Sequence, residues 1–233
     1  MLVGADPGSY LGEALPGSSI TLADVDSSLL SACPPVATRM AGVTTRRLEM
    51  RPIEERSVEL LEPVFAKVEV WRYPYGRAFS RGETEAFVAG QVEHWETLGF
   101  GLWTVFEQGS SLAVGYLGLS VPTFLPEVLP AVEVGWRLDP QVWGKGYATE
   151  GARAALQSGF EVLRLEEIVS LPQSENPPSV RVAERIGMRR DRTTIAPATA
   201  KRGPVDVAVM VMSSQDWASQ TDRDPDRDTP GTA

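Results

Sequence analysis

Two glycines one residue apart, Gly144 and Gly146, precede a helix-like pattern in DPQVWGKGYATEGARAAL (residues 139–156), and a strand-like pattern, VEVGWRL, comes just before. Backbone N–H groups in the first turn of a helix lack partners inside the helix and lie at its positive end. Glycines let an anion approach these groups without a Cβ in the way, and Lys145 adds a nearby positive charge. The segment therefore predicts a strand–turn–helix unit that binds phosphate, although the same glycines also suit a tight turn without a ligand.

Two common nucleotide-binding motifs do not fit this turn. The P-loop pattern requires an earlier glycine and a Ser or Thr after the lysine, and neither is present around Lys145. The dinucleotide fingerprint requires a third glycine at the position of Thr149. Neither nucleotide interpretation is favoured.

The pattern of elements around the turn predicts one α/β domain with a mixed sheet. Helices are expected over 54–68, 80–99, 147–163 and 178–188, and the second has a capping box at Ser80 and Glu83 with Gly99 as its C-terminal cap. Strands are expected over 46–53, 100–107, 112–120, 131–138, 166–172, 189–195 and 204–212. The early strands form a meander, and the later ones alternate with helices, which is typical of a single mixed domain.

The two ends of the chain differ in composition from this body. Residues 1–42 read as a weakly ordered N-terminal extension, 43–213 as the folded domain and 214–233 as a disordered acidic C-terminal tail. Met40, just before the first expected strand, is a candidate for the natural translation start.

Charge and composition exclude several classes of function. The net charge of −9 is shared between both ends and the body, so a basic nucleic-acid face is not favoured. No apolar run is long enough for a membrane span, and the default compartment is the cytoplasm. One cysteine, Cys33, and one histidine, His94, do not make a usual zinc site, so no metal is expected. We expect a monomer or a homodimer.

The turn and its surroundings resemble a known family. Gln141-x-x-Gly144-x-Gly146 is similar to the Q/R-x-x-G-x-G/A signature of the GNAT superfamily of N-acetyltransferases. Together with ENPPSVRVAERIGM (residues 175–188), it resembles the ribosomal-protein N-acetyltransferase (RimJ/RimL-like) branch, over about residues 44–190. The resemblance implies an α/β (α+β) fold with a mixed, mostly antiparallel central sheet of about six to seven strands. Helices flank the sheet in this fold, and a splayed pair of parallel strands holds the cofactor.

The resemblance also implies acetyl-coenzyme A as cosubstrate and assigns residues to it. Its pyrophosphate would lie on the turn after Gln141, at the amides of Val142, Trp143, Gly144, Lys145, Gly146, Tyr147 and Ala148. Its pantetheine arm would pair with Gly135, Trp136, Arg137 and Leu138 and bond to Asn176. Independently, a lone strand glycine such as Gly135 often marks a bulge or a close backbone approach. A backbone N–H freed there can polarise the thioester carbonyl.

Acetyl transfer to an amine requires a general base and a general acid. Glu133 is the base candidate because it shares a strand face with Gly135 and Arg137, although a solvated carboxylate or one paired with Arg137 is the ordinary alternative. The tyrosine that serves as the acid in many family members is replaced by Ala183. Ser179, one helical turn earlier, is the acid candidate, and capping of its helix is the alternative role.

The remaining candidates are weaker. His94 is the single histidine, and a lone helical histidine is usually a partly buried surface residue and not a catalytic one. The aromatic residues Trp71, Tyr73, Tyr75, Phe100 and Trp103 line either an acceptor pocket or the core. The leading hypothesis is direct acetyl transfer to a primary amine of a small molecule, peptide or protein N-terminus. The alternative is a non-catalytic acyl-coenzyme A sensor of the same fold.

Overall fold

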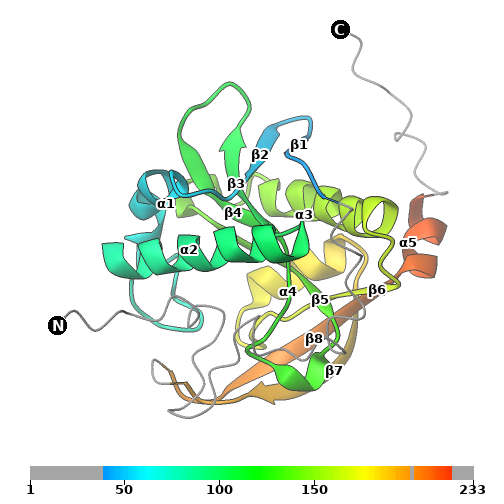
Figure 1. Ribbon diagram of the computed structural model, residues 1–233. Helices are drawn as coiled ribbons and strands as arrows, with labels where there is room; N and C mark the ends of the chain where they lie inside the picture. The colour runs from blue at the N-terminus through cyan, green and yellow to red at the C-terminus, as the bar shows by residue number, and fades with distance from the viewer. Residues whose placement is uncertain (1–38, 200–201, 222–233) are drawn as a thin grey trace, which may run out of the picture.

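A single sheet organises the residues that the computed structural model describes, 39–199 and 202–221 (Figure 1). Its strands are β1 (Val43–Thr44), β2 (Leu48–Pro52), β3 (Leu102–Glu107), β4 (Ala113–Ser120), β5 (Val132–Leu138), β6 (Glu167–Ser170), β7 (Arg189–Ala196) and β8 (Val205–Ser213). They form an eight-stranded sheet in the order β1-β2-β3-β4-β5-β6-β8-β7. The mixed fold is confirmed. The expectation of about six to seven strands misses β1, which is too short to show alternation in the sequence.

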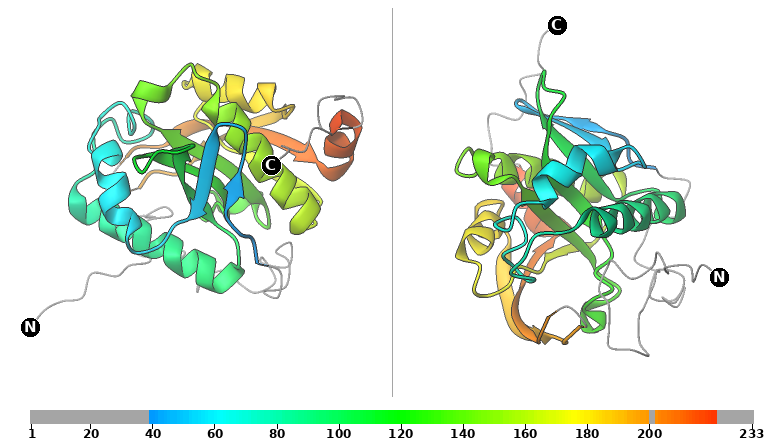
Figure 2. Two further views of the ribbon diagram at one scale, coloured as in Figure 1. Left: turned by 90° about the horizontal axis from the view of Figure 1, so that it is seen from above. Right: turned by 90° about the vertical axis from the view of Figure 1, so that its left-hand side faces the viewer.

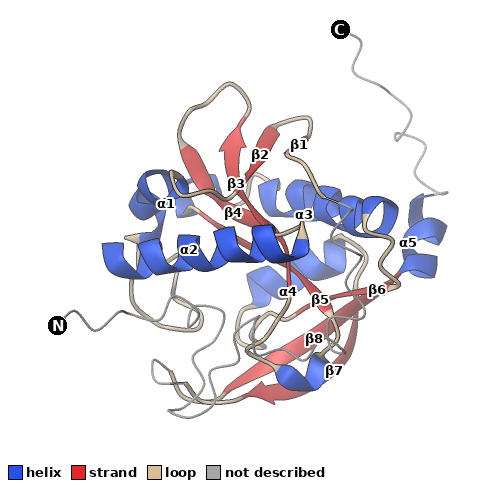
Figure 3. Ribbon diagram, in the orientation of Figure 1, coloured by secondary structure: helices blue, strands red, loops and turns tan. Residues whose placement is uncertain are grey.

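The helices cover both faces of this sheet (Figure 3). They are α1 (Ser57–Phe65), α2 (Arg81–Leu98), α3 (Tyr147–Gln157), α4 (Pro177–Arg185) and α5 (Ser214–Thr221), with short turns η2 (Pro126–Val128), η3 (Pro140–Val142) and the π-helical η4 (Ser158–Val162). Helices α1 and α2 lie on one side of the sheet and α3 on the other (Figure 2). Helix α2 begins with the expected Ser80–Glu83 capping box and ends at Gly99, whose φ is 73°.

The central feature of the sheet is a short parallel pairing. Strands β1 to β5 are antiparallel neighbours, and β6, β8 and β7 form a second antiparallel group. The two groups are joined by β5 and β6, which pair in parallel at Val132↔Ile168 and Glu133↔Val169. Strand β5 then continues to Leu138 without β6 beside it, so a wedge opens between the two strands. The expected splayed parallel pair is confirmed.

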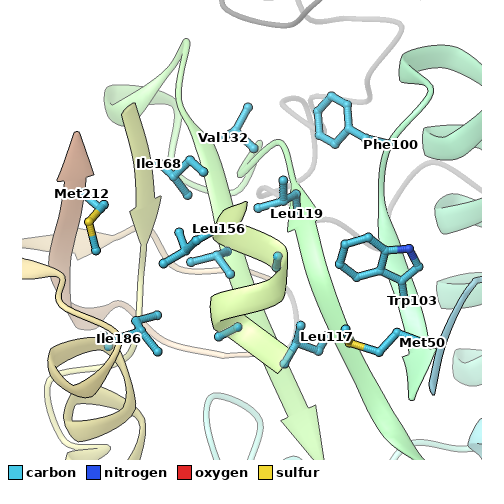
Figure 4. Packing of buried hydrophobic residues seen from close by; sticks show 14 of the residues in the cluster. Met50, Phe100, Trp103, Leu117, Leu119, Val132, Leu156, Ile168, Ile186 and Met212 are labelled. Atoms are coloured by element: carbon cyan, nitrogen blue, oxygen red, sulfur yellow. The ribbon is translucent and has the colours of Figure 1, made fainter. Parts of the chain in front are cut away.

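Helix α3 packs closely against the strands on one side of this wedge. It buries Gly151, Ala152, Ala155 and Leu156. A Cβ added at Gly151 would lie 2.8 Å from the Leu117 side chain, so the small residues set the approach of the helix. The cluster beneath the helix includes Met50, Phe100, Trp103, Leu117, Leu119, Val132, Leu156, Ile168, Ile186 and Met212 (Figure 4). Helix α3 is therefore held close against the sheet.

The boundaries at the two ends of the domain need correction. Residues 214–221 form α5, where the sequence predicts a disordered tail. Ser213 and Asp216 cap this helix: Ser213 Oγ donates to the Asp216 carboxylate at 2.7 Å, and the Asp216 N–H donates to Ser213 Oγ at 3.1 Å. Trp217 stabilises the helix further by stacking on Phe160. At the other end, Met40 is buried and its N–H donates to the Gly99 carbonyl at 2.8 Å, so residues 39–42 belong to the folded domain. The rest of both predicted terminal segments, 1–38 and 222–233, lies outside the described residues.

Within residues 39–199 and 202–221, no helix has the length and apolar character needed to cross a membrane.

Candidate active site

A cavity of about 890 Å³ lies at the wedge between β5 and β6. Several parts of the chain line it, among them the turn before α3, strand β5, helix α4, the loop between α1 and α2, and the β7–β8 hairpin. Eleven of the thirteen residues predicted to bind the cofactor line this cavity, namely Gly135, Trp136, Arg137, Leu138, Val142, Trp143, Gly144, Gly146, Tyr147, Ala148 and Asn176. Gln141 and Lys145 are exposed at its edge and are not among the lining residues.

The turn before α3 presents unpaired backbone donors to the cavity. Gly144 and Gly146 have φ angles of 78° and 81°, which favour glycine. A Cβ at Gly144 would meet nothing within 4 Å, so the space above the turn is open. Within the described part of the chain, the following amides have no acceptor: Gly144, Gly146, Tyr147, Ala148 and Thr149. They lie at the positive end of α3, an arrangement that binds anions.

Only some of the turn amides predicted to bind pyrophosphate are free to donate to a ligand. The N–H groups of Val142, Trp143 and Lys145 donate to carbonyls within the turn, at 3.0, 3.1 and 3.3 Å, so their role is structural. The Thr149 amide, which is not part of the predicted set, is free instead. The Trp143 indole donates to the Leu138 carbonyl at 2.8 Å, and this contact ties the turn to the end of β5.

Arg47, from the turn between β1 and β2, holds the same segment in place. It is not among the residues predicted from the sequence. Its Nη1 donates to the Lys145 carbonyl at 2.8 Å, and its Nε pairs with Glu150 at 2.6 Å. The Lys145 ammonium is itself paired with Glu107 at 3.0 Å. The charge that the sequence places on the turn is therefore partly neutralised, and Arg47 holds the turn in place.

A buried aspartate fixes the entrance to the turn. Asp139 is 8% exposed; one carboxylate oxygen lies 2.5 Å from Lys67 Nζ, and the other accepts from the Gln141 N–H at 2.9 Å. The signature glutamine thus contributes its backbone to the turn, while its side chain is exposed.

Glu133 lies where the wedge begins, in the last paired position between β5 and β6. Burial raises the pKa of its carboxyl group to about 7, against the opposing effects of a hydrogen bond from the Leu171 backbone and the charge of Arg137. No ion pair joins Glu133 to Arg137 in the described structure, so the alternative in which the two pair is wrong. A cavity-lining carboxyl with a pKa near neutrality can accept a proton at physiological pH.

Arg137 instead holds the loop opposite β5. Its Nη1 donates to the carbonyls of Val70 at 2.5 Å and Tyr73 at 2.7 Å. Its Nε donates to the Tyr116 hydroxyl at 3.2 Å, and its guanidinium lies 4.1 Å from the Trp71 ring centroid. One side chain of β5 therefore clamps the loop that forms the far wall of the cavity.

Gly135 forms the floor between Glu133 and Arg137. A Cβ added there would meet nothing within 4 Å, because the position faces the cavity. Its pairing with Gly118 of β4 is regular, so a bulge at Gly135 is wrong. Register shifts lie instead between β3 and β4, at Val105/Phe106, and between β7 and β8, at Arg190/Arg192. Close approach of a ligand to the backbone is the role that the geometry leaves for this glycine.

The two predicted residues of α4 have distinct positions. Asn176 is the N-cap, and its side-chain oxygen accepts from the Ser179 N–H at 3.4 Å. Capping by Ser179 itself is therefore wrong. The Ser179 hydroxyl has no hydrogen-bond partner within the described part of the chain, and the residue lines the cavity. Ala183 is fully buried, so no hydroxyl replaces the missing tyrosine at that position.

His94 is a structural residue. It is fully buried, with Nδ1 2.8 Å from the Phe100 carbonyl and Nε2 accepting from the Val121 N–H at 3.2 Å. These two partners require the neutral tautomer protonated at Nδ1, and burial lowers the pKa of the ring to about 4. His94 is not among the lining residues of the cavity.

The candidate aromatic residues divide between core and cavity. Phe100 and Trp103 are core residues, whereas Trp71, Tyr73 and Tyr75 line the cavity. Trp71 also belongs to the core on the α1–α2 side, where it stacks on Phe79 at 3.5 Å between ring centroids. In the described ranges, no group of three His, Cys, Asp or Glu side chains is placed to hold a metal, and Cys33 lies outside those ranges.

The site thus combines a sheet opened at one parallel pair, a glycine turn that can bind an anion and a near-neutral carboxyl that can accept a proton. The family model "Acetyltransferase (GNAT) domain" matches residues 47–189, which is more than half of the chain. The chain therefore belongs to the GNAT acetyltransferase family.

Curated relatives agree with this assignment. An uncharacterized N-acetyltransferase of Bacillus subtilis, YnaD, is 48% identical over 59 residues, covering 25% of this chain and 35% of that protein. The uncharacterized Bacillus subtilis protein YkkB is 30% identical over 152 residues, 65% of this chain and 87% of its own. An FsC-acetyl coenzyme A-N(2)-transacetylase of Aspergillus fumigatus is 30% identical over 158 residues, covering 64% of this chain and 65% of the relative.

Solved structures show the same fold. A GNAT-family acetyltransferase from Bacillus anthracis is 27% identical, with a TM-score of 0.61 over 75% of this chain and 99% of that one. A structure described as a ribosomal-protein-serine acetyltransferase from Vibrio cholerae has 22% identity and a TM-score of 0.60, over 75% of this chain and 99% of its own. At that identity, the second similarity shows the fold alone.

Proposed function

We propose that this protein is an acetyl-coenzyme A-dependent N-acetyltransferase that transfers the acetyl group directly to a primary amine. The observation that carries the proposal is the continuity of one cavity, which joins the free amides before α3, the open edge of β5 and Glu133. The name of the Aspergillus fumigatus relative includes acetyl coenzyme A and an N(2) position, which supports acetyl transfer to nitrogen.

The residues present fit this cosubstrate. The amides of Gly144, Gly146, Tyr147, Ala148 and Thr149 would hold its pyrophosphate, and the open edge of β5 at Gly135 would accept its amide-bearing arm. The bound thioester supplies an activated acetyl group.

The proton transfers are assigned to two side chains. Glu133 takes the proton that the amine loses as the new C–N bond forms. The Ser179 hydroxyl donates a proton to the sulfur that departs when the C–S bond breaks, and solvent restores the serine. The products are an amide and free coenzyme A, so the atoms and charges balance without a metal or an oxidant.

Thiol release on incubation with acetyl-coenzyme A and a panel of peptide amines, free amino acids, polyamines and aminoglycosides tests the proposal. We expect turnover with at least one acceptor class. If the protein binds acetyl-coenzyme A tightly but releases no thiol with any acceptor, the enzyme proposal fails and the sensor alternative gains support. That alternative is motivated by Ala183, which leaves the position of the usual proton donor without a hydroxyl.

A further inference from the structure

The charge of the cavity is opposite to that of the chain. The whole chain has a net charge of −9. The charged residues that line the cavity are Glu69, Glu133, Arg72, Arg137, Arg181, Arg185 and Arg202. Arginine thus outnumbers glutamate at the cavity, and one of the two glutamates has a pKa near 7. A cavity with this balance favours anionic ligands over polycationic ones.

The arginines divide between the two halves of the cavity. Arg181 and Arg185 belong to α4, on the side of the proposed phosphate turn, where a coenzyme accounts for positive charge. Arg137 is occupied by the carbonyls of the loop that it clamps. Arg72 and Arg202 lie on the acceptor side, in the α1–α2 loop and the β7–β8 hairpin. Their charge is not explained by the coenzyme.

Arg202 is held in a geometry that leaves one edge of its guanidinium open. Its Nη1 donates to the carbonyls of Pro197 at 2.9 Å and Gly203 at 3.0 Å. Its backbone is fixed at the end of the hairpin, where its carbonyl accepts from the Thr199 N–H at 2.8 Å. The Nε and Nη2 groups have no partner in the part of the chain that the structure describes. These two groups donate in parallel along one edge, which is the fork that binds a carboxylate bidentately.

The surroundings of Arg202 do not neutralise it. No carboxylate of the described residues forms an ion pair with Arg202, although ion pairs engage many arginines elsewhere on the protein. Burial lowers the pKa of its guanidinium, against the opposing effect of Tyr75. Tyr75 packs against Trp71 at 5.8 Å between ring centroids, and both rings line the cavity together with Arg202. A partly buried cation without an anionic partner is stabilised by an anionic ligand.

We propose that Arg202 determines specificity by binding a carboxylate of the acceptor, so that the acceptor is an amine that also bears a carboxylate, such as a free amino acid. The inference rests on the proposed acetyl transfer, since it names the substrate class of that same cavity. Polyamines and aminoglycosides are disfavoured because their several positive charges face Arg72 and Arg202.

Matched acceptor pairs test the proposal. The purified chain is assayed by thiol release with α-amino acids, β-alanine and γ-aminobutyrate, each against its carboxamide. Rates are compared at equal concentrations of neutral amine, because the carboxamides have lower amine pKa values. We expect at least one acid to exceed its carboxamide by about 10- to 100-fold in kcat/KM, as a bidentate arginine contact implies. In Arg202→Gln this preference disappears through a higher KM for the acid, and Arg202→Lys recovers part of it.

Two controls separate the possible outcomes. Arg190→Gln, at an exposed arginine of β7 outside the cavity lining, should keep the preference. An Arg202→Gln variant that changes the KM for acetyl-coenzyme A and leaves the acid preference intact would assign Arg202 to the coenzyme and overturn the proposal. Equal rates for acids and carboxamides in the unmodified protein would also overturn it.

Ligand-induced thermal stabilisation distinguishes this failure from failure of the proposed function. If no acceptor is acetylated, a stabilisation by the acids that Arg202→Gln abolishes supports carboxylate binding while the enzyme proposal fails. No stabilisation and no turnover would overturn both.

Discussion

The two halves of the cavity differ in the groups that line them, which are backbone groups in one half and side chains in the other. The half beside α3 is made of backbone groups: free amides on a turn held by Arg47 and Asp139, and the open edge of β5. The opposite half is made of side chains, with Arg137 on β5, Tyr73 in the α1–α2 loop and Arg202 in the β7–β8 hairpin. In the proposed function, the backbone donors would hold the coenzyme, which is the same for every acceptor, whereas the side chains would recognise a particular acceptor. Substitutions should therefore separate donor binding, acceptor binding and chemistry.

The largest effect is expected at the boundary between the halves. Glu133→Gln should lower kcat by about 10²- to 10⁴-fold, because the amine then loses its proton acceptor. Affinity for acetyl-coenzyme A should stay unchanged, as measured by calorimetry. In the unmodified protein, kcat/KM calculated for the neutral amine should rise with pH and level off above about 7, the pKa of Glu133, and the variant should lose that rise.

Glu69→Gln is the matched control for this prediction, since Glu69 is an exposed carboxylate on the wall of the same cavity. It should retain nearly full activity. If Glu133→Gln were as active as this control, Glu133 would not be the base.

A smaller effect is expected on the donor half. Gly146→Ala places a side chain at a φ of 81° and a Cβ 3.4 Å from Arg47 Nη2. The strain, about 1–2 kcal/mol, and the obstruction should weaken acetyl-coenzyme A binding by about 10-fold or more. Acceptor KM should change little in steady-state kinetics.

Gly82→Ala serves as the comparison, because this α2 glycine has no positive φ and open space around it. It should leave binding intact. Equal affinities for acetyl-coenzyme A in the two variants would remove the turn from the donor site.

On the acceptor half, Arg137→Lys should release the loop from β5. A lysine cannot reproduce the contacts to the Val70 and Tyr73 carbonyls, the Tyr116 hydroxyl and the Trp71 ring at once. We expect acceptor KM to rise by about 10-fold or less, with little change in acetyl-coenzyme A affinity. Should coenzyme affinity fall and acceptor KM stay constant, Arg137 would belong to the donor half.

The smallest effect is a dependence of stability on pH. The folded pKa of Glu133 is raised from 4.5 to about 7, so the folded state binds more protons than the unfolded state between these values. Its contribution is therefore fully present below about pH 4.5 and is lost as the pH rises through 7. Denaturant unfolding at pH 5 and pH 8 should show Glu133→Gln gaining about 1 kcal/mol relative to the parent at pH 8. A constant difference at both pH values would contradict this.

Local patterns account for what the sequence predicts well. The capping box of α2, its Gly99 cap and the turn at Gly144 and Gly146 depend on residues close together in the chain. By contrast, the bracing by Arg47 joins residues 98 and 103 positions apart, and the Arg137 clamp spans 64 and 67 positions. Sequence spacing carries no signal for such contacts, because they depend on how separate elements pack.

The same reason explains the errors in individual roles. Ser179 and Asn176 both suit a helix cap by residue type, and the choice of Asn176 depends on where α4 begins. His94 reads as a partly exposed helical residue, yet the packing of β4 and α2 encloses it between two backbone partners. Helix α5 is short and polar, and its docking through Trp217 onto Phe160 is a tertiary contact.

The two residue pairs between β5 and β6 have a mechanical consequence. They are the connection between two parts of the sheet, one made of β1 to β5 and the other of β6, β8 and β7. By comparison, seven residue pairs join β7 to β8. A molecule bound in the wedge contacts both parts of the sheet and so stabilises the connection between β5 and β6. Amide hydrogen exchange in β6 should therefore slow when the wedge is filled, which makes the protection of that strand a direct gauge of occupancy.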